Sequence, residues 1–335
     1  MTQKILGSHS RIHTQAEPWI LLNPLNSLNS RNITASYNHK VNVRGTRAFI
    51  SSLPGGEEQY WSELGNSYSR LYASILAREN KEIFLDKTPR YYLVAEDLRR
   101  MFPESVAICL LRNPMAVLNS IISTWTRRKL YTLCRFRQDL IEAPEIFGRL
   151  LSNPGDGSVF LRYEDLVQYP AEEIARVCDR IGVEFEPGML DYKRETVFEL
   201  GDRKSVDALD GPSSSFQDSW VPALADPQVW RLQNEYFELL GVDTFRRLGY
   251  DPASVLGILE SNRPSTQSLK NTLSLDLLLD DQRDPLLGLH RLQRESEVMH
   301  RDLKRVTESI EYKVGRAVTW PLRLVRRGFV ERGRG

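Results

Sequence analysis

Three short apolar runs, each followed directly by polar residues, stand out in the hydrophobic pattern of the chain. They cover residues 83–85, 106–111 and 159–161. Continuous apolar runs of this length are typical of strands that are buried on both faces of a sheet. Helical patterns bound these runs, as in 171–182, where apolar residues recur every three or four positions. Strands that alternate with helices predict an α/β domain with a parallel sheet flanked by helices.

Polar residues follow each run at positions 86–88, 112–114 and 162–164. A parallel sheet places its ligands at the carboxyl ends of its strands, so binding residues are expected at these positions. Within the second group, Asn113 is a good helix cap and Pro114 suits the first helical position. The sequence therefore predicts a helix that begins directly after the second strand.

Arg112 is expected at the carboxyl end of the second strand, beside the start of this helix. The free N–H groups of a helix start and the planar fork of a guanidinium both suit phosphate oxygens. The hydroxyl of Ser120 can supply one further donor. The same pattern also fits an arginine that is salt-bridged at a strand end and a serine that faces a neighbouring helix. The local sequence leaves both interpretations open.

Composition excludes several classes of function. The chain has 335 residues, 41% of them apolar, which is enough to bury a substantial core. With 45 basic and 44 acidic residues, it lacks the high positive charge of a dedicated nucleic-acid-binding protein. The three widely spaced cysteines indicate neither a disulfide framework nor a zinc site, and they suit a reducing compartment. The sequence has no apolar run of about 18 residues and no secretory signal pattern, so a cytoplasmic location is expected.

The chain changes in character after residue 251. Residues 252–285 are rich in Ser, Asp, Asn and Leu with weak periodicity, which predicts a linker after a compact domain of residues 1–251. Apolar residues then recur at helical intervals among charges, which predicts an amphipathic helical tail over 286–335. Residues 286–312 have the spacing of a short coiled coil, through which two copies would pair as a homodimer.

The end of this tail, residues 312–335, is strongly basic. It contains seven Lys or Arg residues against one Glu, with Trp and Phe among them. A basic amphipathic segment suits an anionic membrane surface, which would make the protein peripheral at the inner membrane face. A solvated helix that packs on its own domain is the alternative.

Four motifs, in order, resemble those of the PAPS-dependent sulfotransferases: FLDKTPRYY, LLRNPMAVLNSI, LRYEDLV and LGDRKSV. PAPS is 3′-phosphoadenosine 5′-phosphosulfate, the donor of the sulfuryl group. The resemblance spans residues 5–251, and the arginine and serine eight positions apart are its most specific element. It implies a P-loop-like α/β fold in which Arg112 and Ser120 grip the 3′-phosphate of the nucleotide.

The resemblance implies further donor-binding residues. Tyr163 matches the tyrosine near the adenine, an environment that suits a ring with a hydroxyl. Lys204 and Ser205 match a segment that returns to the nucleotide, where an ammonium favours the phosphates. Arg203 is an alternative to Lys204, and an ordinary solvated loop fits this segment equally well.

The same resemblance implies two catalytic residues. Glu17 matches the glutamate that takes the proton from the acceptor in several branches of the family, and His9 and His13 are competitors for this role. Lys87 matches the lysine that reaches the sulfuryl group and the bridging oxygen, with Asp86 and Arg90 expected to orient it.

The expected function is transfer of a sulfuryl group from PAPS to a hydroxyl acceptor, without a metal ion. A carbohydrate, a lipid-linked sugar and a small metabolite all remain open as acceptors, although the aromatic and polar mixture of residues 23–72 suits a carbohydrate. The alternative is a non-catalytic nucleotide-binding or scaffold protein of the same fold. A kinase or nucleotidase is disfavoured because the chain has no G-x-x-x-x-G-K-[ST] motif.

In the family, a glycine-rich turn resembling PRSGST binds the 5′-phosphosulfate. This loop is expected directly before MTQKIL, because MTQKIL fits the helix that follows the loop. The sequence therefore predicts that the first strand and its loop lie upstream of Met1, because of a misplaced start codon, or that the chain is a pseudoenzyme. In either case the chain from Met1 is expected to have little or no activity, since the backbone donors of this loop are missing.

Overall fold

The computed structural model describes residues 1–15, 17–29, 35, 37–155, 157–191, 212–213, 217–280 and 299. The predicted amphipathic tail over 286–335 lies outside the described residues apart from position 299, and so do Lys204 and Ser205. The coiled-coil pairing and the membrane contact of this tail stay predictions.

The described part of the chain contains four short strands, which form two parallel pairs. β1 (Ile12–Thr14) pairs with β2 (Ile83–Leu85), and β3 (Ala107–Leu111) pairs with β4 (Ser158–Arg162). The three strands expected from the apolar runs are confirmed, and the pairing is parallel as predicted. β1 was not predicted from the sequence.

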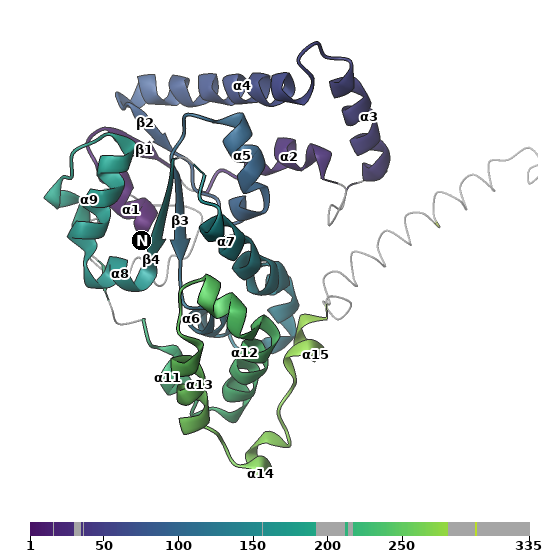
Figure 1. Cartoon of the computed structure of the whole chain (residues 1–335), viewed down its shortest axis with the longest axis vertical. Coiled ribbons are helices and arrows are strands. Elements are labelled where there is room, and N and C mark those ends of the chain that lie inside the picture. Colours follow the sequence, from purple (N-terminus) through teal and green to yellow (C-terminus); the bar gives the residue numbers. More distant parts are fainter. Residues whose placement is uncertain are drawn as a thin grey trace, which may run out of the picture.

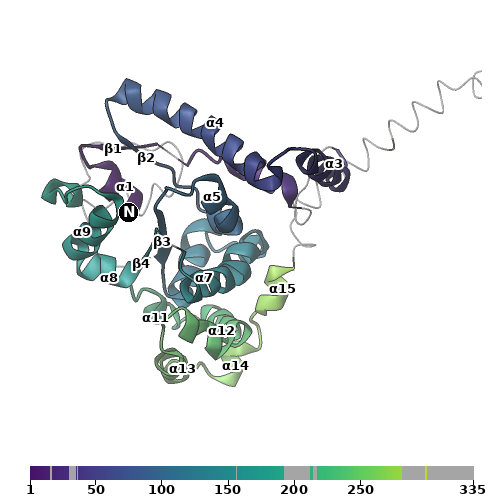
Figure 2. The ribbon, with the colours of Figure 1, turned by 45° about the horizontal axis from the view of Figure 1, so that its top comes forward.

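Helices cover the strands on two sides. In Figures 1 and 2, α8 (Tyr163–Gln168) and α9 (Pro170–Ile181) lie on one side, and α5 (Ala95–Met101) and α7 (Ala143–Ser152) on the other. The helix predicted at 171–182 is confirmed as α9, whose apolar face packs with α1 (Thr2–Gly7) and the strands in one buried cluster. The fold is therefore α/β, with parallel strands between layers of helices.

Two clusters of helices extend this unit at opposite ends. At one end lie α2 (Leu22–Leu25), α3 (His39–Ser51) and α4 (Gly56–Glu79). The other end holds α6 (Pro114–Ser120), α11 (Trp220–Ala223), α12 (Pro227–Arg247), α13 (Pro252–Ser261), α14 (Thr266–Leu269) and α15 (Leu275–Leu279). Short 3-10 or π turns connect them: Asn26–Leu28, Tyr91–Val94, Ile121–Trp125, Leu130–Phe136, Gln138–Glu142 and Pro187–Leu190.

The segment interpreted as a linker is packed against the domain over residues 252–280. It contains α13, α14 and α15, and its buried leucines belong to the same core as α6 and α12. The indole N–H of Trp230 on α12 donates to the carbonyl oxygen of Leu259 on α13 (2.8 Å). The prediction of a linker is therefore wrong over residues 252–280. The helices there were missed because helices of four to ten residues are too short for their periodicity to stand out.

Among the described residues, no helix combines the length and the hydrophobicity that a membrane span requires.

Gly65 allows α4 to pack closely on α5. It is buried, and a Cβ at this position would overlap the carbonyl oxygen of Met101. We expect Gly65→Ala to lower the free energy of unfolding by about 1–3 kcal/mol, because a backbone atom cannot move aside as a side chain would.

Gly45 provides the matched control, since it lies within α3 with no atom near its own Cβ position. Gly45→Ala is expected to leave stability unchanged or to raise it by about 0.5–1 kcal/mol, because alanine is the better helix former. Urea unfolding of both variants measures the difference. Equal stability of the two would show that α4 and α5 do not pack as described.

Candidate active site

The two residues expected to act in catalysis, Glu17 and Lys87, are in contact. Lys87 lies just beyond the end of β2, and Glu17 lies just beyond the end of β1. Because β1 and β2 are parallel neighbours, their carboxyl ends meet, and the Lys87 ammonium donates a hydrogen bond to Glu17 Oε1. The Glu17 side chain is 12% exposed and that of Lys87 is 42% exposed, so the pair lies partly open to solvent.

Hydrogen bonds on both sides hold the segment that carries Glu17. The backbone N–H of Trp19 donates to the hydroxyl of Thr88, which is buried beside Lys87 (3.2 Å). On the other side, the Gln3 amide of α1 donates to the Thr14 hydroxyl (2.9 Å) and to the Gln15 carbonyl (2.7 Å). The position of Glu17 relative to β2 is therefore set by several elements that are distant in sequence.

The two histidines that compete with Glu17 are placed differently. His9 is buried, its Nδ1 accepts from the backbone N–H of Arg11 (2.9 Å), and its Nε2 lies 2.9 Å from the Glu184 carbonyl oxygen. Both ring nitrogens of His9 are thus engaged. His13 lies within β1, opposite Phe84, and its ring packs tilted on the Phe84 ring with centroids 5.6 Å apart.

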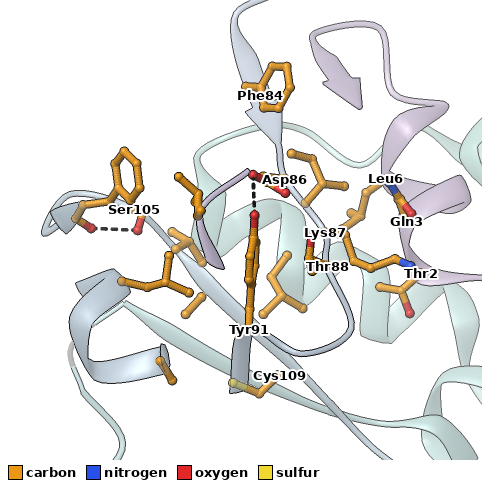
Figure 3. Close-up of a pocket in the computed structure, with 18 of the residues that line it drawn as sticks. Thr2, Gln3, Leu6, Phe84, Asp86, Lys87, Thr88, Tyr91, Ser105 and Cys109 are labelled. Carbon is orange, nitrogen blue, oxygen red and sulfur yellow. Dashed lines mark hydrogen bonds between the residues drawn. The ribbon is translucent and has the colours of Figure 1, made fainter. Parts of the chain in front are cut away.

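Asp86, between β2 and Lys87, is held by two tyrosines that the sequence did not single out. The hydroxyls of Tyr72 (2.6 Å) and Tyr91 (2.9 Å) both donate to Asp86 Oδ2, and Figure 3 shows Tyr91 reaching this carboxyl group. Burial raises the pKa of the Asp86 carboxyl, although both hydrogen bonds act in the opposite direction. Burial also raises the pKa of each tyrosine hydroxyl. This cluster anchors the backbone that presents Lys87.

Arg112 and Tyr163 form a second group beyond β3 and β4. The strand register pairs Leu111 with Arg162, so the residues that follow them are also neighbours. The Arg112 guanidinium lies 4.2 Å from the centre of the Tyr163 ring, a cation–π arrangement. Burial raises the pKa of the Tyr163 hydroxyl, and the Arg112 charge acts in the opposite direction.

Glu164 ties the two strand ends together. Its carboxylate accepts from the backbone N–H of Asn113 (2.9 Å) and from the Tyr250 hydroxyl (3.0 Å). The Asn113 side chain accepts from the backbone N–H of Met115 (3.0 Å), and Pro114 is the first residue of α6. The cap and the helix start predicted after β3 are therefore confirmed, whereas the roles of Glu164 and Tyr250 were not predicted.

The remaining predicted residues are Ser120, Lys204 and Ser205. Ser120 is the last residue of α6 and is partly buried. Lys204 and Ser205 lie outside the described residues. Within the described part of the chain, no group of three His, Cys, Asp or Glu side chains is arranged to hold a metal ion.

The sequence profile of the sulfotransferase family matches residues 1–187, more than half of the chain. The protein belongs to the sulfotransferase family. The matched range contains both groups described above, and the membership of the sulfotransferase family that the sequence motifs indicated is confirmed.

A curated relative is the nodulation protein NoeE of Sinorhizobium fredii, which is 28% identical over 229 residues. The match covers 58% of this chain and 52% of NoeE, so this chain spans about half the length of that relative. Among solved structures, the chain is similar to a sulfotransferase domain from the curacin biosynthetic pathway (21% identity, TM-score 0.42, 65% of this chain and 84% of that chain). A sulfotransferase domain from the Synechococcus PCC 7002 olefin synthase gives 20% identity, a TM-score of 0.41 and coverage of 65% and 81%.

Proposed function

We propose that this protein transfers a sulfuryl group from PAPS to a hydroxyl group of an acceptor. The observation that carries the proposal is the contact between Glu17 and Lys87 at the joined carboxyl ends of β1 and β2, in a chain of the sulfotransferase family. A carboxylate and a movable cation at one point are the two groups that such a transfer requires.

Arg112 and Tyr163 suit the nucleotide part of PAPS. A guanidinium offers several N–H donors in one plane, which matches phosphate oxygens, and its stacking on Tyr163 fixes that plane. The tyrosine ring offers an apolar face with a polar tip, which suits adenine. We assign the 3′-phosphate to Arg112 and Ser120, the adenine side to Tyr163, and further phosphate contacts to Lys204 and Ser205.

The chemistry follows from the two charges. PAPS supplies the sulfuryl group, and adenosine 3′,5′-bisphosphate leaves as the bond between sulfur and its 5′-phosphate oxygen breaks. The Glu17 carboxylate takes the proton from the acceptor hydroxyl as the hydroxyl oxygen bonds to sulfur. The Lys87 ammonium stabilises the negative charge that grows on the departing phosphate oxygen. Glu17 is favoured over His9 as the base because both ring nitrogens of His9 already have partners.

The acceptor is proposed to be a carbohydrate, a glycolipid or a small metabolite. Comparison of the lipids and glycans of the producing cell with and without the gene, by mass spectrometry, identifies it. We expect a sulfated species to disappear with the gene and to return with the unaltered gene but not with Glu17→Gln. An unchanged set of sulfated molecules would contradict the proposal.

The basic segment 312–335 is proposed to hold the protein at the inner membrane face, where a lipid-linked acceptor would lie. We expect the full chain to sediment with vesicles that contain anionic lipid, and a chain ending at Pro285 to stay in solution, because the basic and aromatic residues are lost. Neutral vesicles provide the control. Equal sedimentation of the two chains with anionic vesicles would show that the tail does not bind the membrane.

A further inference from the structure

Three consecutive basic residues, Arg127, Arg128 and Lys129, form a surface loop after the turn Ile121–Trp125. All three side chains are exposed, and none of them forms a salt bridge with a described residue. The sequence from residue 105 to residue 138 contains no Asp or Glu, although the whole chain has 44 acidic residues. The positive charge of the loop is therefore not balanced by its neighbours in the sequence.

The backbone of this loop is strained. Arg127 (φ 48°) and Arg128 (φ 62°) both adopt the left-handed conformation that favours glycine. Among the described residues, only Trp19 and Asn80 share this conformation without being glycine. Asn80 caps the end of α4, where the conformation is ordinary, and Trp19 lies two positions from Glu17. Strained residues of this kind persist where the surrounding structure holds them, and they concentrate at functional sites.

Hydrogen bonds hold the loop at both ends. The backbone N–H of Arg128 donates to the carbonyl oxygen of Ile122 (3.2 Å), and the buried hydroxyl of Thr126 donates to the same oxygen (2.8 Å). Beyond the loop, the backbone N–H of Thr132 donates to the carbonyl oxygen of Lys129 (2.9 Å). The three cations are therefore presented from a fixed backbone.

Two aromatic side chains flank the cations. Trp125 is 50% exposed and Tyr131 is 51% exposed. The Trp125 ring packs tilted on the Phe136 ring with centroids 6.5 Å apart, which supports the indole from one side. Ring faces offer apolar contact area, and guanidinium groups bind carboxylates and sulfates in one plane. Sugar rings that carry carboxylate or sulfate groups combine the two matching properties.

The loop is connected to both groups of the candidate active site. α6 begins just after Arg112, and α6 and the turn that follows it have 7 and 5 residues, so the loop lies about 15–18 Å from Arg112. On its other side the loop leads into the turn Leu130–Phe136. The Arg90 guanidinium, three positions after Lys87, donates to the carbonyl oxygen of Arg135 in this turn (3.2 Å). A ligand that contacts both the loop and the active site must therefore be extended.

We infer that the loop 125–131 binds an anionic polysaccharide, and that such a polysaccharide is the acceptor. The role as acceptor rests on the proposed function, whereas the binding site does not. Arg127, Arg128 and Lys129 bind the carboxylate or sulfate groups, and the two rings pack on the sugars between them. A lipid surface is less well matched, because it requires a continuous apolar face and here three cations separate the two rings.

The test measures binding of oligogalacturonate, a chain of sugars with carboxylates, by titration calorimetry. The 335-residue chain is compared with a loop variant that combines Arg127→Gln, Arg128→Gln and Lys129→Gln. We expect the loop variant to bind at least about 10-fold more weakly, because it loses charge-assisted hydrogen bonds. Dextran sulfate replaces carboxylates by sulfates, and the same loss with either polymer supports the inference. Neutral dextran should bind to neither form.

A second triple variant, with Arg180→Gln, Arg263→Gln and Lys270→Gln, is the matched control. It also removes two arginines and one lysine that are exposed, and the basic segment 312–335 is present in all forms. We expect its affinity to stay within about 2-fold of that of the unaltered chain, since the loop is intact. Equal losses in the two variants would reduce the binding to net charge and overturn the inference. A loop variant that loses binding to anionic vesicles but not to either polymer would also overturn it.

Arg128→Gly and Arg128→Ala test the strained backbone. Both variants lose the charge, but only glycine adopts the left-handed conformation without a steric penalty. We therefore expect the glycine variant to melt about 2 °C higher than the alanine variant. A higher melting temperature for alanine would show that the loop does not have this conformation, and would contradict the inference.

The role as acceptor is tested in gene-deleted cells that carry the loop variant or its control within the natural gene. We expect the control to restore the sulfated product and the loop variant to restore at most about a tenth of it, in line with its lower affinity. Full restoration by the loop variant would overturn this role. Polymer binding does not depend on sulfuryl transfer: loss of binding evidence leaves the proposed function standing, and absence of transfer leaves the binding site standing.

Discussion

Glu17→Gln is expected to lower turnover by about 10²- to 10⁴-fold, the usual effect of losing a general base. Glutamine keeps the size of the side chain and its hydrogen bond to Lys87, but it cannot take the proton of the acceptor hydroxyl. Nucleotide affinity should be unchanged, because Glu17 lies at β1 and β2 whereas Arg112 and Tyr163 lie beyond β3 and β4. The measurement is the rate of sulfated product formation in gene-deleted cells that carry each variant within the natural gene, so that any sequence before Met1 is kept.

Glu79→Gln is the matched control, since Glu79 is an exposed residue at the end of α4 whose only salt bridge is with its neighbour Arg78 among the described residues. It should retain the full rate. If Glu17→Gln also retains most of the rate, Glu17 is not the base, and His13→Ala becomes the decisive variant because the His9 ring is already occupied.

Arg112→Ala is expected to weaken binding of adenosine 3′,5′-bisphosphate by about 1.5–3 kcal/mol, the scale of a hydrogen bond to a charged group. That corresponds to about 10- to 150-fold in affinity, which titration calorimetry resolves. Adenosine 5′-monophosphate should bind equally to both forms, because it has no 3′-phosphate for the guanidinium to contact.

Arg112→Lys separates charge from geometry, since lysine keeps the positive charge but loses the planar fork that stacks on Tyr163. An intermediate affinity is expected. If the bisphosphate binds as well to Arg112→Ala as to the unaltered protein, the 3′-phosphate lies elsewhere. A loss of equal size for both nucleotides would assign Arg112 to another part of the ligand.

Much of the sheet could be predicted because its strands are apolar and uninterrupted. β1 could not, since Ile12 is the one aliphatic residue among its three. The packed helices of 252–280 were missed for a related reason. α15 has only five residues, and its leucines acquire a partner through α12, which no local pattern reveals.

Part of the candidate site could also be predicted from the sequence, and part could not. Arg112 and Tyr163 could be placed together from the sequence, because each follows a predicted strand of one parallel sheet. The roles of Glu17 and Lys87 followed only from the family resemblance. Their contact was not predicted, since its physical basis is the pairing of β1 with β2. Tyr72 was missed because α4 brings it to Asp86 through tertiary packing.

Transfer of labelled sulfate from PAPS decides whether the protein is an active sulfotransferase. PAPS that carries radioactive sulfur is added to extracts of the producing cell with and without the gene, so that the natural acceptor is present in both. We expect a labelled lipid, glycan or metabolite only in the extract that contains the protein, and we expect it to be lost in the Glu17→Gln variant. Label that stays in the nucleotide in both extracts, although the protein binds adenosine 3′,5′-bisphosphate, would contradict it and leave a nucleotide-binding protein without transferase activity.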